Sequence, residues 1–228
     1  YPPSACGPVK PLHILMLTMF IDLAGFAMFI PLLNYIVAEL GGSIFTVGLL
    51  ITAFSLAQFA CLPAWGRLSD RIGRRPVIML GLGGAAVAYA VFGLADPALG
   101  LSDDRRLLLG VLFLSRIMLG VMSANYAAAY AYVADVTPPE ERAQGMGMLG
   151  VAFGLGFVCG PVLGGLLGQW GFWLPAFFGS GLALLNLYCA WRWLPESLPP
   201  DHVVRPRVSP GEALRETLAY LRQPRLGW

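Results

Sequence analysis

Six stretches of this chain are each long and apolar enough to cross a lipid bilayer as an α-helix. A membrane-spanning helix needs roughly 20 mostly apolar residues, and its backbone bonds to itself because lipid offers no hydrogen-bond partner. The six stretches are residues 12–40, 45–65, 76–95, 107–134, 144–168 and 172–194. The sequence therefore predicts an all-α integral membrane protein with six transmembrane helices.

The composition agrees with a membrane protein and excludes an ordinary water-soluble domain. Of the 228 residues, 57% are hydrophobic and only 12% are charged, whereas a soluble domain carries about a quarter charged residues. The first apolar stretch is too long for a signal peptide and lacks a small-residue cleavage site. The four cysteines form no CxxC pair and no Cys/His cluster, so neither a disulfide framework nor a metal site is expected.

Positive charge gathers on one side of the predicted membrane. The connections on that side and the two ends of the chain hold Lys10, Arg67, Arg71, Arg74, Arg75, Arg142, Arg192 and the five arginines after residue 200. The connections on the other side hold only Arg105 and Arg106. Because Lys and Arg accumulate in cytoplasmic segments, we expect both termini to be cytoplasmic. Arginines at membrane edges give no sign of a nucleic-acid partner.

The densest group of charges is the segment GRLSDRIGRRPVI, residues 66–78, between the second and third apolar stretches. Its arginines can hold the segment inside the cell and meet anionic lipid headgroups. Asp70 can accept hydrogen bonds from arginines or lie at a helix N-terminus, where the helix dipole favours an anion. Gly66 predicts close contact with a neighbouring helix, and Gly73 predicts a tight turn. A topology anchor alone would explain the arginines but not the Gly-x-x-x-Asp spacing.

The same segment resembles the loop signature of the major facilitator superfamily, Gly-x-Leu-(Ser/Ala)-Asp-Arg-x-Gly-Arg-Arg. The matching positions are Gly66, Leu68, Ser69, Asp70, Arg71, Gly73, Arg74 and Arg75. Residues 115–147 resemble the fourth helix of that family and the loop after it. The resemblance extends over roughly residues 12–194 and is to the tetracycline-efflux and multidrug:proton antiporter branch.

A second motif lies in the fifth apolar stretch, where GFVCGPVLGG resembles the family's antiporter motif Gly-x-x-x-Gly-Pro-x-x-Gly-Gly. The matching positions are Gly156, Gly160, Pro161, Gly164 and Gly165. Glycine at every fourth position also predicts a flat helix surface for close packing, and the proline predicts a bend. Packing alone would explain the glycines, whereas the Gly-Pro order in the fifth of six helices favours the antiporter motif.

The resemblance implies that these six helices are the amino-terminal half of a twelve-helix transporter. It also implies that the loop charges clasp the two halves together in one conformation. We call this predicted set the latch: Gly66, Asp70, Arg71, Gly73, Arg74, Arg75, Asp135 and Arg142.

The predicted organisation is a cytoplasmic leader (1–11), a membrane domain (12–194) and a cytoplasmic linker (195–228). The linker would contain an amphipathic helix and the lead-in to a missing seventh span. The chain starts with Tyr1 rather than Met and has half the family's helices. A half-size protein that pairs with a partner is the alternative.

Two charged residues lie deep within predicted spans. Asp22 falls in the first stretch and Arg116 in the fourth, and at 1.5 Å per residue both lie near the bilayer midplane. Charges at this depth are costly and are usually functional, and the binding sites of such transporters lie at the midplane. We expect Asp22 to take up and release a proton and to meet substrate. Arg116 either joins that site or neutralises Asp22.

The predicted cavity consists of these two charges with nearby aromatic and polar side chains on the first, second and fourth stretches. These residues are Asp22, Phe26, Phe29, Ser55, Gln58, Arg116, Ser123 and Tyr130. Such a mixture suits an amphipathic organic solute. For any single uncharged residue of this set, helix packing is the competing explanation.

The leading functional hypothesis is proton-coupled export of a small organic solute or drug. Facilitated or symport uptake by the same fold is the second hypothesis. A non-transporting membrane scaffold is the third, and the midplane charges count against it. The sequence contains no phosphate-binding loop, metal cluster or nucleophile arrangement, so we expect neither an enzyme nor a cofactor. The expected partners are a small solute, protons, the lipid bilayer and the missing carboxy-terminal half.

Overall fold

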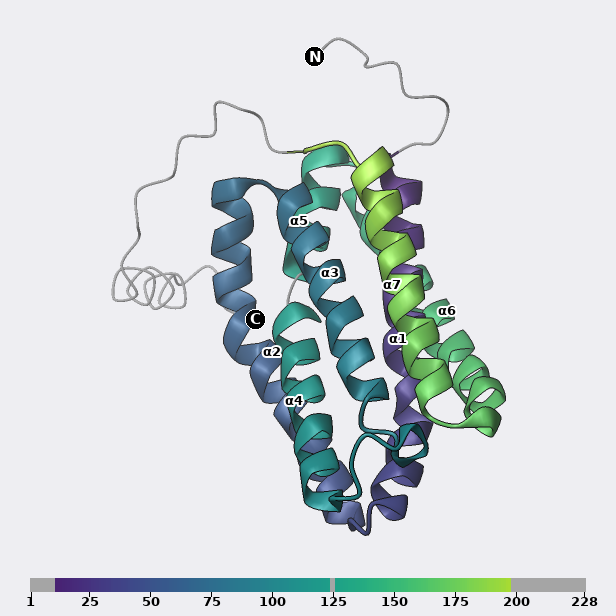
Figure 1. Ribbon diagram of the computed structural model, residues 1–228. Coiled ribbons are helices and arrows are strands. Elements are labelled where there is room, and N and C mark those ends of the chain that lie inside the picture. Colours follow the sequence, from purple (N-terminus) through teal and green to yellow (C-terminus); the bar gives the residue numbers. More distant parts are fainter. Residues whose placement is uncertain (1–10, 124–125, 198–228) are drawn as a thin grey trace, which may run out of the picture. The chain divides into compact units, whose positions relative to one another are not determined.

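The computed structural model describes residues 11–123 and 126–197, and the regular structure within them is helical (Figure 1). The helices are α1 (Pro11–Glu39), α2 (Ile44–Ile72), α3 (Arg74–Gly93), α4 (Arg105–Ser123), α5 (Tyr126–Val136), α6 (Arg142–Leu167) and α7 (Trp173–Trp193), with short 3₁₀ turns η1 (Pro97–Leu99) and η2 (Gly168–Trp170). Six helical stretches are long and apolar enough to cross a membrane, and α4 and α5 fall within one of them. The predicted all-α fold with six membrane-spanning helices is confirmed.

Parts of the predicted organisation lie outside the described residues. These parts are residues 1–10 of the leader and residues 198–228 of the linker, including the predicted amphipathic helix and the lead-in to a seventh span.

The largest difference from the predicted boundaries is at the Arg-rich segment. We predicted a helix over 45–65 followed by a loop, but α2 continues to Ile72. Only Gly73 separates α2 from α3, with φ 102° and ψ 159°, a backbone region that favours glycine. The predicted turn at Gly73 is confirmed. The predicted close helix contact at Gly66 is not made among the described residues, where a Cβ at this position would meet no atom within 4 Å, and it stays a prediction.

Helices α1 and α3 are the most enclosed, and α2 and α6 lie on opposite sides of them (Figure 1). Helix α1 packs against α6 and α7, while α3 packs against α7 and α4. The membrane-length windows of α1 and α3 are 61% and 56% buried, compared with 17% for α2 and 22% for α6. Much of the apolar surface of α2 and α6 is therefore open to lipid or to further protein.

Two clusters of buried apolar residues hold the helices together. One cluster lies toward the end where α2 meets α3, which we call the Arg-rich end, and includes Leu15 and Met19 of α1. The other cluster includes Met28 and Phe29 of the same helix. Asp22 occupies the stretch of α1 between these two groups, so the apolar packing of α1 is interrupted by a carboxylate near its middle.

The glycine-rich face of α6 packs directly on α1. A Cβ at Gly160 would lie 2.6 Å from the carbonyl oxygen of Ala24, and a Cβ at Gly156 would lie 2.7 Å from that of Phe20. A Cβ at Gly164 would come closer still, against the carbonyl oxygen of Met28. The predicted flat packing surface is confirmed for these glycines, and it fixes α6 against the helix that carries Asp22.

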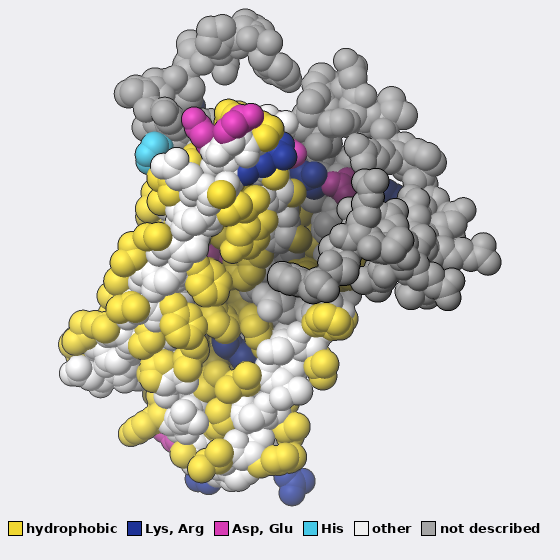
Figure 2. Space-filling view, turned by 180° about the vertical axis from the view of Figure 1, so that it is seen from behind, with side chains coloured by type: hydrophobic (Ala, Val, Ile, Leu, Met, Phe, Trp, Pro, Cys, Tyr) yellow, Lys and Arg dark blue, Asp and Glu magenta, His cyan; other side chains and the backbone are white. Residues whose placement is uncertain are grey.

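The opposite end of the helices is tied by Asp96. Its Oδ1 accepts a hydrogen bond from the amide of Ala98 at 2.8 Å, and its Oδ2 accepts one from the amide of Trp173 at 2.7 Å. This buried carboxylate therefore caps η1 and holds the beginning of α7 beside it. Between the two ends, the face seen in Figure 2 is mostly hydrophobic, and most of its charged side chains lie toward the ends. That distribution suits a bundle that crosses a bilayer.

Candidate functional site

Asp22 is a buried carboxylate in the middle of α1. Only 6% of the residue is exposed. The side chain of Tyr126, at the start of α5, lies beside this carboxylate, and Ser123 lies beside Tyr126. Tyr126 therefore lies between the carboxylate of α1 and the last residue of α4. Among the described residues, Asp22 thus has a hydroxyl neighbour and no basic side chain within ion-pair distance.

Arg116 is a buried cation on α4. It is 2% exposed, and its guanidinium carbon lies 5.3 Å from the ring centre of Phe29 and 4.7 Å from that of Phe92. Such contacts between a cation and aromatic faces are favourable, more so away from water. Its Nε and Nη2 atoms have no hydrogen-bond partner among the described residues.

The hypothesis that Arg116 neutralises Asp22 is not supported by the structure. In the described part of the chain, the ion pairs within 4.0 Å both involve Arg74. The buried residue Tyr89 of α3 lies near enough to both Asp22 and Arg116 to interact with the charge of each. The two charges therefore belong to one region of the bundle, with a tyrosine close to both rather than a direct ion pair.

The other predicted cavity residues divide into two groups. Phe29 and Ser123 are buried beside the charged pair, and the Phe29 ring also stacks on Tyr89 with 5.0 Å between ring centres. Phe26 instead stacks on Phe54 of α2 at 4.9 Å. The structure brings Phe29 and Ser123 together with the two charges, whereas Phe26 contributes to the α1–α2 contact.

Three predicted polar or aromatic cavity residues are more open to their surroundings. Ser55 is exposed and Gln58 is half-buried on α2, the helix with the smallest buried share. Tyr130 on α5 is 43% exposed. Nothing in the described contacts joins these three to Asp22 or Arg116, and their predicted role in the cavity stays a prediction.

Sequence reasoning missed three aromatic residues of this site: Tyr89, Phe92 and Tyr126. Tyr89 and Phe92 lie in the third apolar stretch, where neither charge nor motif marks them. A hydroxyl inside an apolar span was the one available signal, because a buried tyrosine usually needs a polar neighbour.

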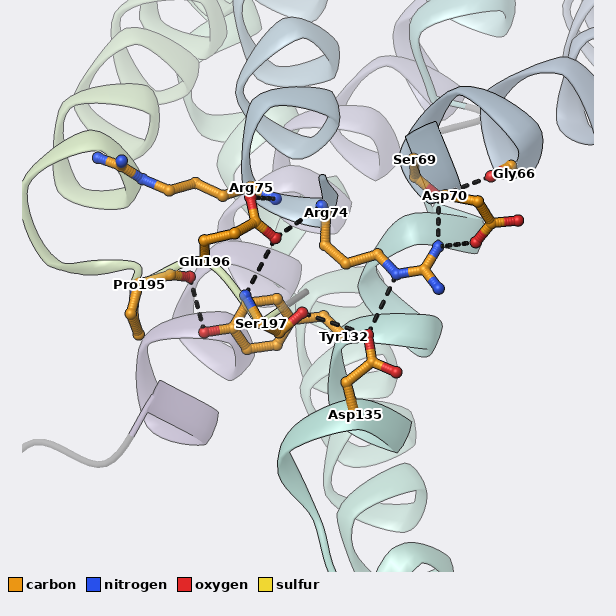
Figure 3. Close-up of polar contacts among 10 residues, drawn as sticks. All are labelled: Gly66, Ser69, Asp70, Arg74, Arg75, Tyr132, Asp135, Pro195, Glu196 and Ser197. Carbon is orange, nitrogen blue, oxygen red and sulfur yellow. Dashed lines mark hydrogen bonds and ion pairs between the residues drawn. The ribbon is translucent and has the colours of Figure 1, made fainter. Parts of the chain in front are cut away.

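The charged cluster at the Arg-rich end is centred on Arg74, the first residue of α3 (Figure 3). Its Nη1 lies 2.6 Å from Oδ1 of Asp70 and donates to Oγ of Ser69 at 2.7 Å. Its Nε donates to Oδ2 of Asp135 on α5 at 3.2 Å. One arginine side chain therefore links the end of α2, the start of α3 and the end of α5.

Glu196, just after α7, completes this cluster and was not predicted. Its Oε1 accepts the amide hydrogen of Arg74 at 2.9 Å, and its Oε2 accepts that of Arg75 at 3.2 Å (Figure 3). A carboxylate at this place satisfies amides that a helix N-terminus leaves free and is favoured by the helix dipole. A Cβ at Gly73 would collide with the same carboxylate, so both backbone conformation and space favour glycine there.

The residues on either side of Glu196 are bound to α5. The hydroxyl of Tyr132 donates to the carbonyl of Pro195 at 3.0 Å, and the hydroxyl of Ser197 donates to Oδ2 of Asp135 at 3.3 Å. Figure 3 shows these contacts beside those of Arg74. The chain leaving α7 is therefore part of the same polar cluster.

The remaining latch residues are less closely joined to this cluster. Asp70 has a side chain that is 63% exposed, and Arg71 is exposed. Arg142, at the start of α6, donates from Nε to the carbonyl of Thr137 at 3.4 Å. Arg75 donates from its guanidinium to the carbonyl of Trp191. The structure thus joins Asp135 to Asp70 through Arg74 and places Arg142 in a separate local contact.

Comparison with known proteins agrees with the fold. The sequence model of the Major Facilitator Superfamily matches residues 15–228. The tetracycline resistance protein, class C, of Escherichia coli is 36% identical over 77% of this chain and 42% of its own length. Multidrug resistance protein 2 of Bacillus subtilis is 35% identical over 81% of this chain and 44% of its own length.

A solved structure is also similar. The human organic anion transporter MFSD10 (TETRAN) superposes with a TM-score of 0.67 and 29% identity, covering 85% of this chain and 50% of that one. The chain spans about half the length of the relatives it matches. Because the family model matches residues 15–228, the chain belongs to the Major Facilitator Superfamily.

Proposed function

We propose that this chain is the amino-terminal half of a secondary transporter that exports a small organic solute in exchange for protons. The observation that carries the proposal is Asp22, a carboxylate buried in the middle of a membrane-spanning helix with a tyrosine hydroxyl as its neighbour. Buried ionisable groups in membrane helices are costly and mark ion or proton pathways. The names of relatives, which include tetracycline and multidrug resistance proteins and an organic anion transporter, point to organic solutes.

Coupling requires that Asp22 bind a proton more tightly in one conformation than in the other. Burial disfavours the ionised carboxylate, and contact with water or a donor favours it. A rocking motion that changes the access of Asp22 to water would therefore change its proton affinity. Arg116 lies in the same region, and its positive charge would interact electrostatically with a charged solute.

The direct test uses the complete protein in sealed proteoliposomes. A pH gradient should drive uphill movement of a transported probe, and the probe in turn should drive proton movement reported by an internal pH dye. Suitable probes are tetracycline, cationic ethidium and anionic fluorescein. Solute movement that ignores the pH gradient for every probe would contradict proton exchange. Movement of solute and protons in the same direction would favour the second hypothesis, symport uptake.

We further propose that the Arg-rich end is cytoplasmic, as the distribution of Lys and Arg predicts. Asp103 and Glu140 are exposed at opposite ends of the helices. In a variant without the four native cysteines, Asp103→Cys should react with an impermeant maleimide added outside intact cells, and Glu140→Cys should react only after lysis. Reaction of both from outside would refute the six-span topology.

If the latch stabilises one conformation, Asp70→Asn should slow transport while leaving the stability of the protein nearly unchanged. The Asp70–Arg74 ion pair is exposed and spans one helical turn, and such pairs contribute only about 0.3–0.5 kcal/mol. Abundance and melting temperature should therefore stay near wild type. Transport should fall by roughly tenfold, because the pair would stabilise one of two conformations and its loss shifts their balance.

Two matched variants complete that test. Asp103→Asn alters an exposed acid at the other end and should leave transport unchanged. Arg75→Ala should be milder than Asp70→Asn, because the contact of residue 75 with Glu196 is made by its backbone amide. Normal transport by Asp70→Asn would reduce the segment to a topology anchor.

A further inference from the structure

One buried cation in the bundle lacks the partners that its burial requires. Arg116 is 2% exposed, and its Nε and Nη2 atoms are buried without hydrogen-bond partners among the described residues. In the same part of the chain, the ion pairs involve Arg74 and not Arg116. A charge removed from water without a counter-charge or hydrogen bonds is unfavourable. The side chain of Arg116 therefore needs a hydrogen-bond acceptor, preferably an anionic one.

The free atoms of Arg116 also indicate the shape of that acceptor. Nε and Nη2 form one edge of the guanidinium, and their N–H bonds on that edge run nearly parallel. This is the edge that binds both oxygens of a carboxylate in paired hydrogen bonds. The orphaned donors are thus a matched pair suited to a planar oxyanion, rather than scattered unsatisfied atoms.

Aromatic rings hold the guanidinium in place while leaving this edge free. The faces of Phe29 and Phe92 lie 5.3 and 4.7 Å from the guanidinium carbon, and the two rings contact each other edge to face with 4.6 Å between centres. Apolar rings lower the local polarity and so strengthen attraction to an anion. They also offer a surface for the organic part of a ligand.

We propose that Arg116 binds the carboxylate, or a similar oxyanion, of an organic solute through its Nε–Nη2 edge. The inference rests on the proposed transport function and adds the chemical class of the solute and the residue that recognises it. Tyr89 of α3 lies near both Asp22 and Arg116, so the proposed anion site lies in the same region of the bundle as Asp22.

The test measures binding of a matched acid and amide to the complete, purified transporter. Radiolabelled indole-3-acetate and indole-3-acetamide have nearly the same shape and differ in charge. The wild type should bind the acid at least about tenfold more tightly than the amide, as expected for paired charge-assisted hydrogen bonds. Arg116→Gln should remove that preference, and Arg116→Lys should keep only part of it because lysine lacks the paired edge.

Arg106→Gln is the matched control, because Arg106 is an exposed arginine of the same helix α4. It should leave the preference for the acid intact. If Arg116→Gln does not fold, the comparison of Arg116→Lys with the wild type still decides the question. An unchanged acid preference in the lysine variant would then overturn the inference.

Other outcomes contradict the proposal in identifiable ways. Equal binding of acid and amide by the wild type, or binding of neither, would overturn it. Arg116→Gln could instead lower the melting temperature of the ligand-free protein and leave the acid preference unchanged. That result would overturn the proposal and would indicate that Arg116 pairs with an acidic side chain of the second half. If the binding proposal fails in this way, ethidium export driven by a pH gradient would still support the proposed transport function. Acid binding that depends on Arg116, without gradient-driven transport of any probe, would refute the function but not the binding site.

Discussion

Asp22→Asn should abolish the gradient-driven, uphill export that we propose for the complete transporter, while downhill solute movement should survive in part. Asparagine preserves the size of the side chain and can still accept a hydrogen bond from Tyr126, the neighbour of Asp22. It cannot bind and release a proton, so the pH gradient can no longer drive uphill movement of the solute. The measurement is probe accumulation in proteoliposomes with and without an imposed pH gradient, which should become equal in the variant.

Two controls make this result specific to the buried carboxylate. Asp22→Glu retains a titratable group and should keep part of the coupled transport. Asp103→Asn removes an exposed acid far along the chain and should behave as the wild type. If Asp22→Asn still concentrates the probe at the wild-type rate, Asp22 is structural and the coupling acid lies elsewhere in the complete protein.

Gly160→Val should strongly destabilise the protein, because Gly160 lies in the tightly packed glycine-rich face of α6. Even a Cβ at this position would lie 2.6 Å from the Ala24 carbonyl oxygen and 2.7 Å from the Ala27 Cβ. Because the contact is with the backbone of α1, a rotamer change cannot relieve it. Overpacking of this kind costs roughly 1–3 kcal/mol and occasionally more. The melting temperature and the yield of monodisperse protein should both fall.

Gly154→Val is the matched control on the same helix. Gly154 is exposed, and a Cβ there would meet no atom within 4 Å. Its melting temperature should stay near wild type or rise slightly, because glycine is the poorer helix former. If Gly160→Val and Gly154→Val have the same melting temperature, close packing of α6 on α1 does not contribute to stability. The proposed packing role of the motif would then be refuted.

The helical fold was predictable because the membrane imposes a strong rule on composition. Apolar length alone locates six spans, since a helix in lipid must be both long and uncharged. The same rule failed at the end of α2, where charged residues were interpreted as a loop although the helix continues to Ile72. Charge marks the edge of the membrane, whereas a helix ends where the backbone requires it, here at Gly73.

The candidate site was predictable only in its isolated parts. Glycine at every fourth position indicated the contact face of α6, because that spacing follows from helix geometry alone. The surroundings of Arg116 could not be found in the same way. They depend on how α3 is rotated against α1 and α4, and an almost uniformly apolar helix carries no periodic pattern that fixes this rotation. Phe92 and Tyr89 therefore became visible only in the packed structure.

The contacts of Arg74 have a consequence for the order of assembly during synthesis. Arg74 binds Asp135 across 61 positions of the chain and Glu196 across 122 positions. Since a chain emerges from the ribosome from its amino end, α3 exists well before the carboxylate that caps it. The amides at its first turn can be satisfied by Glu196 only after α7 has been made and has inserted. The full set of Arg74 contacts can therefore form only after all six membrane-spanning helices have been synthesised.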